Sequence, residues 1–471
     1  MGNGKSPSLA GYAKKPLVIL SLVAFVDQVD TNVLRGVLPL LKDDWNLNDL
    51  QLGALGFAFV FVNVIATIPA GWVADRYNRT RIVGWTLLSW SGLSALSAIA
   101  INYPTLFLAR AALGIGQAVD DPSSTSLLTD YYPAKVRGRV FSAQQVSVFL
   151  GGGIGLALGG FVGAQLGWRW AFALVGMPGS LIAFLCFKLR EPTRGESELE
   201  GHELGQGPVT PIDAEQSAAR LSPREFLSEA RRSLIEELKF IFSIRTMRYV
   251  LVGVGTLLFT VSGVGYWMAI YHERYSNMTL TQATGVTAVV FAFAGIIGTF
   301  WGGRLADKVF SAGPQGRIRL VATVIMICAA AFLASFMVPV IAVRIALQFL
   351  GVIAISSAFP ALRASMMDVV PAENRGVSAS AFALTSTVFG TALAPPLVGL
   401  LSDVTGSLVA AFYIVTPPVF VGSLILLRAQ HTIANDVQAI VTSMIERQQR
   451  EAAEREAAAA TSTDELESSV D

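Results

Sequence analysis

Apolar stretches long enough to cross a bilayer recur along the whole chain, and this feature restricts the fold more than any other. A spanning helix needs roughly 20 mainly apolar residues. Such stretches begin near Pro16, Leu50, Ile82, Thr105, Gly138 and Trp168 and, after a polar gap, near Met247, Thr281, Ile318, Val338, Gly376 and Ser407. Because 53% of residues are hydrophobic and only 15% charged, a soluble domain would lack the polar surface to cover them. The sequence therefore predicts an all-α membrane protein with about twelve transmembrane helices.

The placement of Lys and Arg predicts how the spans are oriented. Basic loops contain the segments DRYNRTR, PAKVRGR, RLADK and PAENRG, whereas the alternate loops contain NYP, DVTG and the acidic KDDWNLND. Basic loops remain on the cytoplasmic side. The first stretch carries Asp27 and Asp30 and no cleavage site, so we read it as a retained span. Both termini are therefore expected in the cytoplasm, and the membrane is expected to be the bacterial inner membrane.

Composition along the chain divides it into five parts. A polar linker separates two apolar halves, and its second part places Leu234, Leu238 and Ile241 among basic residues, which predicts an amphipathic helix on the inner leaflet. The tail is expected to be partly helical and then disordered. The expected parts are an N-terminus (1–15), a first six-helix bundle (16–190), the linker (191–246), a second bundle (247–430) and the tail (431–471).

Several classes of function are disfavoured by the composition. The net charge of +1 argues against nucleic acid as a partner. Cys186 and Cys328 lie in apolar runs of opposite halves and indicate neither a disulfide framework nor a metal site. No nucleophile elbow or phosphate-binding loop is present. We therefore predict that the protein is not an enzyme and needs no metal or cofactor.

The two halves repeat three features in the same order. The segment GWVADRYNR returns as GRLADK, and TDYYPAKVRG returns as MDVVPAENRG. Arg110, early in the fourth span, is matched by Arg344, early in the tenth. Duplicated halves that face a central site are the architecture of rocking transporters.

These motifs resemble the major facilitator superfamily. The resemblance rests on G-x-x-x-D-R-x-x-R after the second span and on R-x-x-x-G-x-G from Arg110 to Gly116. Within the superfamily the chain looks most like the spinster group, through VDTNVLRGVLP, ARAALGIGQA and LREPTRGE. The resemblance implies two pseudo-symmetric six-helix bundles, a monomer, and a central cavity lined by spans one, four, seven and ten.

Charged residues at membrane depth are costly and mark candidate functional positions. Asp27 and Asp30 are three apart and share a helix face. In the fourth span Arg110, Gln117 and Asp121 lie on one stripe, whereas Asp120 is turned about 100° away. The predicted proton-coupling residues are Asp30, Asp27, Asp121 and Asp120.

Arg110 could hold a carboxylate ionised or bind an anionic headgroup. The candidate carboxylates could release a proton when Arg110 approaches them. They could take up a proton when the anionic group of a substrate binds Arg110 instead. The alternative is a structural ion pair between Asp30 and Arg110 that only fixes helix packing. Asp120 and Asp121 could likewise serve as caps, because Pro122 indicates a local break.

The resemblance to the spinster group aligns Asp30 with the first-span aspartate of that group, a proposed protonation site. Two neighbouring positions differ from the group's pattern, because Thr31 replaces an arginine and Gln117 replaces a glutamate. Asp120 and Asp121 stand where small or aromatic polar residues are usual. Charge has therefore been redistributed around the expected cavity.

Two further sets of residues complete the predicted site. The candidate substrate-binding residues are Arg110, Gln117, Thr31, Tyr266, Trp267, Tyr271 and Arg344, of which the aromatic members face either the cavity or the membrane interface. The candidate gating residues are Gly71, Asp75, Arg76, Arg79, Arg137, Asp307, Lys308 and Arg375. The alternative for the gating set is a basic anchor that only fixes topology.

The resemblance implies a proton-coupled secondary active transporter of lysophospholipids or similar amphiphilic lipids. The expected partners are the lipid substrate, protons and membrane lipids. One alternative is a drug or small organic-anion transporter of the same superfamily. Another is a membrane sensor that binds a ligand without moving it.

Overall fold

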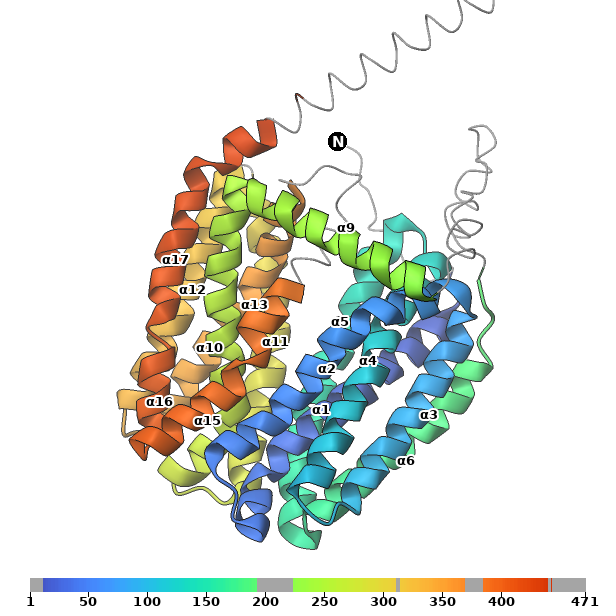
Figure 1. The fold of residues 1–471 in the computed structure, drawn as a ribbon. Helices are drawn as coiled ribbons and strands as arrows, with labels where there is room; N and C mark the ends of the chain where they lie inside the picture. The colour runs from blue at the N-terminus through green and yellow to red at the C-terminus, as the bar shows by residue number, and fades with distance from the viewer. Residues whose placement is uncertain (1–11, 193–222, 311–313, 369–383, 439–441, 443–471) are drawn as a thin grey trace, which may run out of the picture.

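The structure is a computed structural model that describes residues 12–192, 223–310, 314–368, 384–438 and 442. Within helices, a further group of residues is described for the backbone alone, among them Asp75, Asp121 and Asp307. All regular structure in these ranges is helical. The helices form two bundles that stand side by side, the first drawn in blue to green and the second in green to red (Figure 1). The predicted all-α membrane fold is thereby confirmed.

The first bundle contains six long helices joined by short connections. They are α1 (Lys14–Trp45), α2 (Asp49–Arg76), α3 (Arg79–Ala98), α4 (Tyr103–Tyr131), α5 (Ala134–Leu166) and α6 (Trp168–Phe187). Local sequence fixes the helix boundaries: Asn102 caps α4 by accepting from the Thr105 amide at 3.0 Å. Asn46 ends α1 in the left-handed conformation with φ of 50°, a conformation that asparagine tolerates.

The second bundle repeats this plan with two interrupted helices. Its elements are α10 (Arg245–Tyr275), α11 (Leu280–Phe310), α12 (Pro314–Met337), α13 (Ile341–Asp368), η3 (Thr387–Ala392), α15 (Ala394–Thr405), α16 (Leu408–Val415), α17 (Pro418–Arg428) and η4 (Ala429–His431). Pro417 and Pro418 separate α16 from α17, because proline lacks an amide donor. The π turn η3 leads directly into α15 and marks a change of helix geometry beside the cavity described below.

Ten stretches of the described residues are long and apolar enough to cross a membrane. α3 and α4 do not meet that measure, although both stand among the other helices of the first bundle. α4 carries Arg110, Asp120 and Asp121 within its length, which lowers its hydropathy. Arg110 and Asp120 are buried inside the bundle, where other helices shield them from lipid.

Glycines of α5 allow close approach to α1 and to the second bundle. A Cβ at Gly155 would lie 2.3 Å from the Val29 carbonyl oxygen of α1. A Cβ at Gly153 would lie 2.8 Å from the Ala292 Cβ of α11. α5 therefore packs tightly on both sides and forms part of the interface between the halves.

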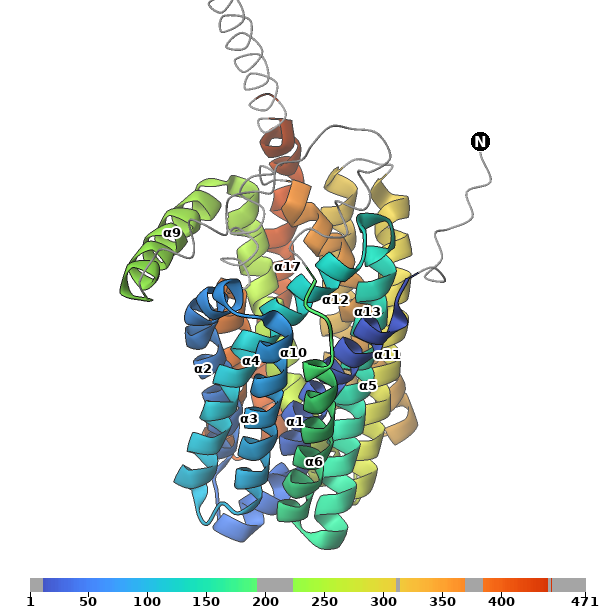
Figure 2. The same ribbon diagram turned by 90° about the vertical axis from the view of Figure 1, so that its right-hand side faces the viewer.

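Helix α9 (Pro223–Ser243) lies outside the two bundles. It runs obliquely from α10 toward α2, at the end of the molecule opposite α15 and α16 (Figure 1). Turning the molecule shows α9 standing clear of the first bundle on one side (Figure 2). Its exposed face carries an ion pair between Arg232 and Glu236 at 2.9 Å. The boundaries of the five predicted parts remain predictions.

Candidate functional site

A small, partly open cavity lies between the two halves. The first half contributes residues of α1, α2 and α4, and the second half contributes residues of α10, η3 and α15. Its charged lining residues are Asp30, Arg35 and Arg110, and apolar or hydroxyl-bearing side chains make up most of the remainder. Both halves thus supply walls, whereas the charge comes from α1 and α4.

Asp30 is the most heavily bonded of these residues. Its side chain is buried and accepts hydrogen bonds from Trp90 Nε1 at 3.0 Å and from the Ser94 hydroxyl. Arg110 Nη1 lies 3.7 Å from Asp30 Oδ2. Two donors of α3 and one cation of α4 therefore hold this carboxylate, which makes an ionised state tolerable at membrane depth.

Arg110 is buried between α1, α3 and α6. It donates from Nη2 to Ser97 Oγ at 2.8 Å, and its guanidinium carbon lies 4.5 Å from the centre of the Phe172 ring. Its Nε has no hydrogen-bond partner among the described residues. The guanidinium thus has one buried donor without a partner while it pairs with Asp30.

Asp27 has a different set of partners although it shares a helix with Asp30. Gln117 Nε2 lies 2.8 Å from both Asp27 carboxylate oxygens, and Gln28 Nε2 donates at 2.8 Å. Gln117 is therefore engaged by Asp27 rather than exposed on the cavity wall. Amide donors at this carboxylate contrast with the arginine at Asp30.

The other two predicted carboxylates lie further along α4. Asp120 is buried and accepts from Ser124 Oγ at 3.2 Å, one turn along its own helix. α4 runs unbroken through Pro122, so the expected local break is absent and this contact does not cap a helix end. The Asp121 side chain lies outside the described residues, so its part in coupling stays a prediction.

The three aromatic residues of α10 separate into one cavity residue and two core residues. Tyr266 lines the cavity and donates to the Leu52 carbonyl of α2 at 2.8 Å, so it bridges the halves. Trp267 is fully buried and donates to the Pro395 carbonyl at 3.0 Å. Tyr271 packs against the rings of Phe336 and Phe412. In this state only Tyr266 is positioned to contact a substrate in the cavity.

Of the remaining predicted substrate residues, Thr31 lines the cavity and Arg344 does not. Thr31 Oγ1 is buried with no hydrogen-bond partner among the described residues. Arg344 donates to the Val338 carbonyl at 3.0 Å and to the Tyr275 carbonyl at 3.1 Å. It therefore ties the end of α10 to the start of α13.

Arg35 is a cavity residue that the sequence analysis did not single out. It lies one helical turn after Thr31, and its guanidinium carbon is 5.6 Å from the Tyr266 ring centre. The signal that could have found it is the rarity of charge within a spanning helix, the same rule that identified Asp30 and Arg110. In the sequence Arg35 stands within the motif VDTNVLRGVLP, and that motif alone does not distinguish it from its neighbours.

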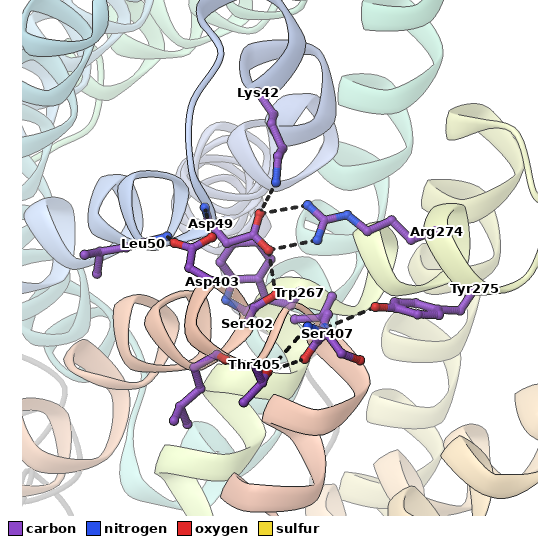
Figure 3. Close-up of polar contacts among 12 residues, drawn as sticks. Lys42, Asp49, Leu50, Trp267, Arg274, Tyr275, Ser402, Asp403, Thr405 and Ser407 are labelled. Carbon is purple, nitrogen blue, oxygen red and sulfur yellow. Dashed lines mark hydrogen bonds and ion pairs between the residues drawn. The ribbon is translucent and has the colours of Figure 1, made fainter.

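The halves are also joined by a polar cluster at the end that holds the α1–α2 and α15–α16 connections, called the closed end below (Figure 3). Asp49 of α2 receives two hydrogen bonds of 2.8 Å from Arg274 of α10. Lys42 and Ser402 donate to the same carboxylate at 2.5 and 2.7 Å. Asp49 is buried at the centre of this cluster, which links α1, α2, α10 and α15.

Asp403 strengthens the same closure from the second half. Its two carboxylate oxygens accept from the backbone amides of Asp49 at 2.9 Å and Leu50 at 2.8 Å (Figure 3). These are the first amides of α2, which have no partner within their own helix. A carboxylate from one bundle thus caps a helix of the other. We call Asp49, Lys42, Arg274, Ser402 and Asp403 the latch.

Of the predicted gating residues, Gly71, Asp75 and Arg76 lie in the part of α2 remote from the latch. The side chains of Gly71, Asp75, Arg76, Asp307 and Arg375 lie outside the described residues, so their gating role stays a prediction. Lys308 of α11 is exposed.

Two members of the gating set have partners inside the first half. Arg79 pairs with Asp130 and, at 2.8 Å, with Glu191. Arg137 donates to the carbonyls of Tyr132 and Thr129 at 2.9 Å each and so stabilises the end of α4. In this state the described contacts of both residues hold the first bundle together.

Comparison with known proteins gives a family and a fold. The family described as Major Facilitator Superfamily matches residues 20–388. The 4-hydroxybenzoate transporter PcaK of Acinetobacter baylyi is 30% identical over 191 residues, which are 40% of this chain and 41% of that protein. The chain thus matches less than half the length of that relative. The probable sulfoacetate transporter SauU of Cupriavidus necator is 24% identical over 87% of this chain and 91% of its own length.

The resemblance to the spinster group is also confirmed. Protein spinster homolog 3 of Mus musculus is 23% identical over 82% of this chain and 74% of its own length. A bacterial homologue of the human lysosomal transporter Spinster, solved in an inward-facing and unoccupied conformation, has a TM-score of 0.70 at 21% identity. That match covers 91% of this chain and 97% of the solved chain.

Proposed function

Because the chain belongs to the major facilitator superfamily, we propose that it is a proton-coupled secondary active transporter of an amphiphilic anion, working by alternating access. The observation that carries this proposal is the buried pair of Asp30 and Arg110 in the wall of a cavity shared by both halves. Ionisable groups at membrane depth are expensive, and a site of exchange between proton and substrate is a reason to keep them.

The pair can link proton and substrate through competition for one cation. Arg110 supplies the counter-charge for a carboxylate ion at Asp30. An anion that enters the cavity can compete with Asp30 for the guanidinium of Arg110, a residue of the cavity wall, and draw it away. Asp30 can then take up a proton, since a buried carboxylate without its cation is more stable when neutral. Substrate and proton are bound together by this route.

The latch supports alternating access. The contacts of Asp49 and Asp403 close one end of the interface between the halves, and they must part before the cavity can open there. If the basic loops are cytoplasmic, as their Lys and Arg content predicts, the closed end faces outward. The overall similarity to an inward-facing solved structure supports this assignment. We propose that the termini are cytoplasmic because of the same basic loops. We also propose that the protein is a monomer of the bacterial inner membrane.

Lysophospholipids are the first substrate candidate because of the spinster-like sequence and fold. Small organic anions are the second candidate, since the relatives include transporters named for 4-hydroxybenzoate and sulfoacetate. Both classes share an anionic group, which is the feature that Arg110 would recognise.

Uptake into proteoliposomes tests this function. Labelled lysophosphatidylglycerol, an anionic lysophospholipid, and labelled 4-hydroxybenzoate are supplied in turn, with and without an imposed proton gradient, and liposomes without protein give the background. We expect saturable flux of at least one probe, increased by the gradient. Saturable binding with no flux would contradict transport and favour a membrane sensor. Flux that is equal with and without the proton gradient would contradict proton coupling.

A further inference from the structure

We infer that Arg35 selects the charge of the substrate, and that the cavity takes a singly charged anion with an apolar body rather than a zwitterion. The inference rests on the proposed function and names the substrate class of the same site. Three features carry it: the balance of charge in the cavity, the surroundings of Arg35 and the absence of a second cavity carboxylate among the described residues.

The described cavity lining has one more positive than negative side chain. Arg35 and Arg110 face Asp30 alone. Asp30 is already held by Arg110, by Trp90 at 3.0 Å and by Ser94. An arginine without a counter-charge in a low-dielectric site is costly, and one entering negative charge would relieve that cost. The net positive charge of the described lining is therefore neutralised by one monoanion.

Arg35 itself is available to a ligand. Its side chain is partly exposed on the cavity wall, and the described part of the chain gives it no ion pair. The guanidinium makes a cation–π contact with the Tyr266 ring, whose centre lies 5.6 Å from the guanidinium carbon. An arginine over an aromatic face retains its outward donors, so it can bind a carboxylate through two hydrogen bonds.

The rest of the lining favours an apolar body and disfavours a second, positive group. Leu34, Phe59 and Val60 present apolar surface. Ser262 already donates to the Thr391 carbonyl at 3.0 Å. The ammonium group of a zwitterion would find Asp30 occupied and no other described carboxylate on the wall. Leaving such a cation unpaired would weaken binding.

Arg35 also lies next to the contact that joins the halves. Tyr266 stacks near Arg35 and donates to Leu52 of α2, and its ring packs directly on Gly56. A Cβ at Gly56 would lie 2.7 Å from this ring. An anion on Arg35 therefore binds beside a residue that must move when the halves separate. Selection of the substrate's charge by Arg35 and movement of the two halves at Tyr266 would therefore take place at neighbouring residues.

Calorimetric binding to the purified full-length protein tests the inference with three probes. Benzoate is the monoanion, benzamide is its neutral counterpart, and lysophosphatidylcholine is the zwitterion. We expect wild type to bind benzoate at least about tenfold more tightly than benzamide. Arg35→Gln should weaken benzoate about tenfold or more while leaving benzamide unchanged, and Arg35→Lys should lie between the two.

Arg319→Gln is the matched control, because Arg319 is an exposed arginine of α12 away from the cavity. Thermal unfolding of each variant shows whether the fold is retained, and Arg35→Lys preserves the charge if Arg35→Gln unfolds. Equal binding of benzoate and benzamide by wild type would overturn the inference. Tight lysophosphatidylcholine binding that persists in Arg35→Gln would overturn it as well.

The same variants separate this inference from the proposed function. Arg35-dependent benzoate binding with no flux into liposomes would leave the inference standing and contradict transport. Gradient-driven flux of a lysophospholipid, unchanged in Arg35→Gln, would leave transport standing and contradict the inference.

Discussion

Arg110 and Arg344 occupy matching positions in the repeat, yet the structure gives them different partners. Arg110 of α4 pairs with the Asp30 carboxylate beside the cavity. Arg344 of α13 donates to the backbone carbonyls of Val338 and Tyr275 and to the Ser276 hydroxyl. One arginine faces an ionisable group that can change state, and the other faces neutral oxygens that cannot.

This difference teaches that duplication preserves a residue more readily than its role. The charged lining of the cavity belongs to α1 and α4, whereas α10 and α15 contribute Tyr266 and Pro395. The first half thus carries the proposed chemistry, and the second half supplies a wall and one side of the latch. The following predictions break or sharpen this contrast.

The largest effect is expected at Arg110. Arg110→Gln removes the cation of a buried pair and leaves Asp30 without its counter-charge, which should lower transport on the order of 100-fold. Uptake into proteoliposomes, normalised to the amount of folded protein, measures this. Uptake within twofold of wild type would show that Arg110 serves packing alone.

The latch should give the next largest effect. Asp49→Asn removes the charge that Arg274 and Lys42 share, and about a tenfold shift toward opening at the closed end is expected. A cysteine placed at Ser262, in the cavity wall, reports opening through labelling by an impermeant maleimide applied at the closed end.

Asp44→Asn is the matched control for the latch. Asp44 also lies near the closed end, but its partners Trp168 and Arg169 belong to the same bundle. Its substitution should leave labelling unchanged. Equal labelling in Asp49→Asn and Asp44→Asn would contradict the latch.

Arg344→Gln should lower stability and spare substrate binding. Loss of charged hydrogen bonds to two carbonyls should cost about 1.5–3 kcal/mol of unfolding free energy. Thermal unfolding and the substrate concentration for half-maximal uptake measure the two effects. A large rise in the substrate concentration for half-maximal uptake, with unchanged stability, would show that Arg344 contacts the substrate.

Thr31→Val should give the smallest effect. Thr31 lines the cavity, and its buried hydroxyl has no partner among the described residues, so a substrate that displaces its neighbours would give it one. Its loss should weaken affinity about fivefold, the equivalent of one hydrogen bond, with stability unchanged. Unaltered affinity would remove Thr31 from the candidate substrate residues.

Much of this arrangement could be predicted from residues that are unusual for their surroundings. Apolar length predicted the helices, and rare membrane charge predicted Asp30 and Arg110, which the structure brings together. The latch could not be predicted, because Arg274 is 225 positions from Asp49 and Ser402 is 353 positions away. Such contacts depend on how two bundles dock, and no local pattern encodes that.

The aromatic residues of α10 show a second limit. Tyr266, Trp267 and Tyr271 were grouped as candidates for the cavity, but α10 is buried on several sides. A helix surrounded by apolar neighbours has no polar face to indicate its direction, so periodicity cannot tell cavity from core. Only the packing of Trp267 on Pro395 and Tyr271 on Phe336 distinguishes them.

The central claim is that Asp30 carries the coupling proton, and Asp30→Asn tests it most directly. Two assays on the same proteoliposomes compare exchange of labelled for unlabelled substrate with accumulation driven by a proton gradient. Asp43→Asn, an exposed aspartate of the same helix, is the control. We predict that Asp30→Asn retains exchange and loses gradient-driven accumulation, because a neutral amide mimics the protonated state permanently. Accumulation at the wild-type level in Asp30→Asn would contradict the account.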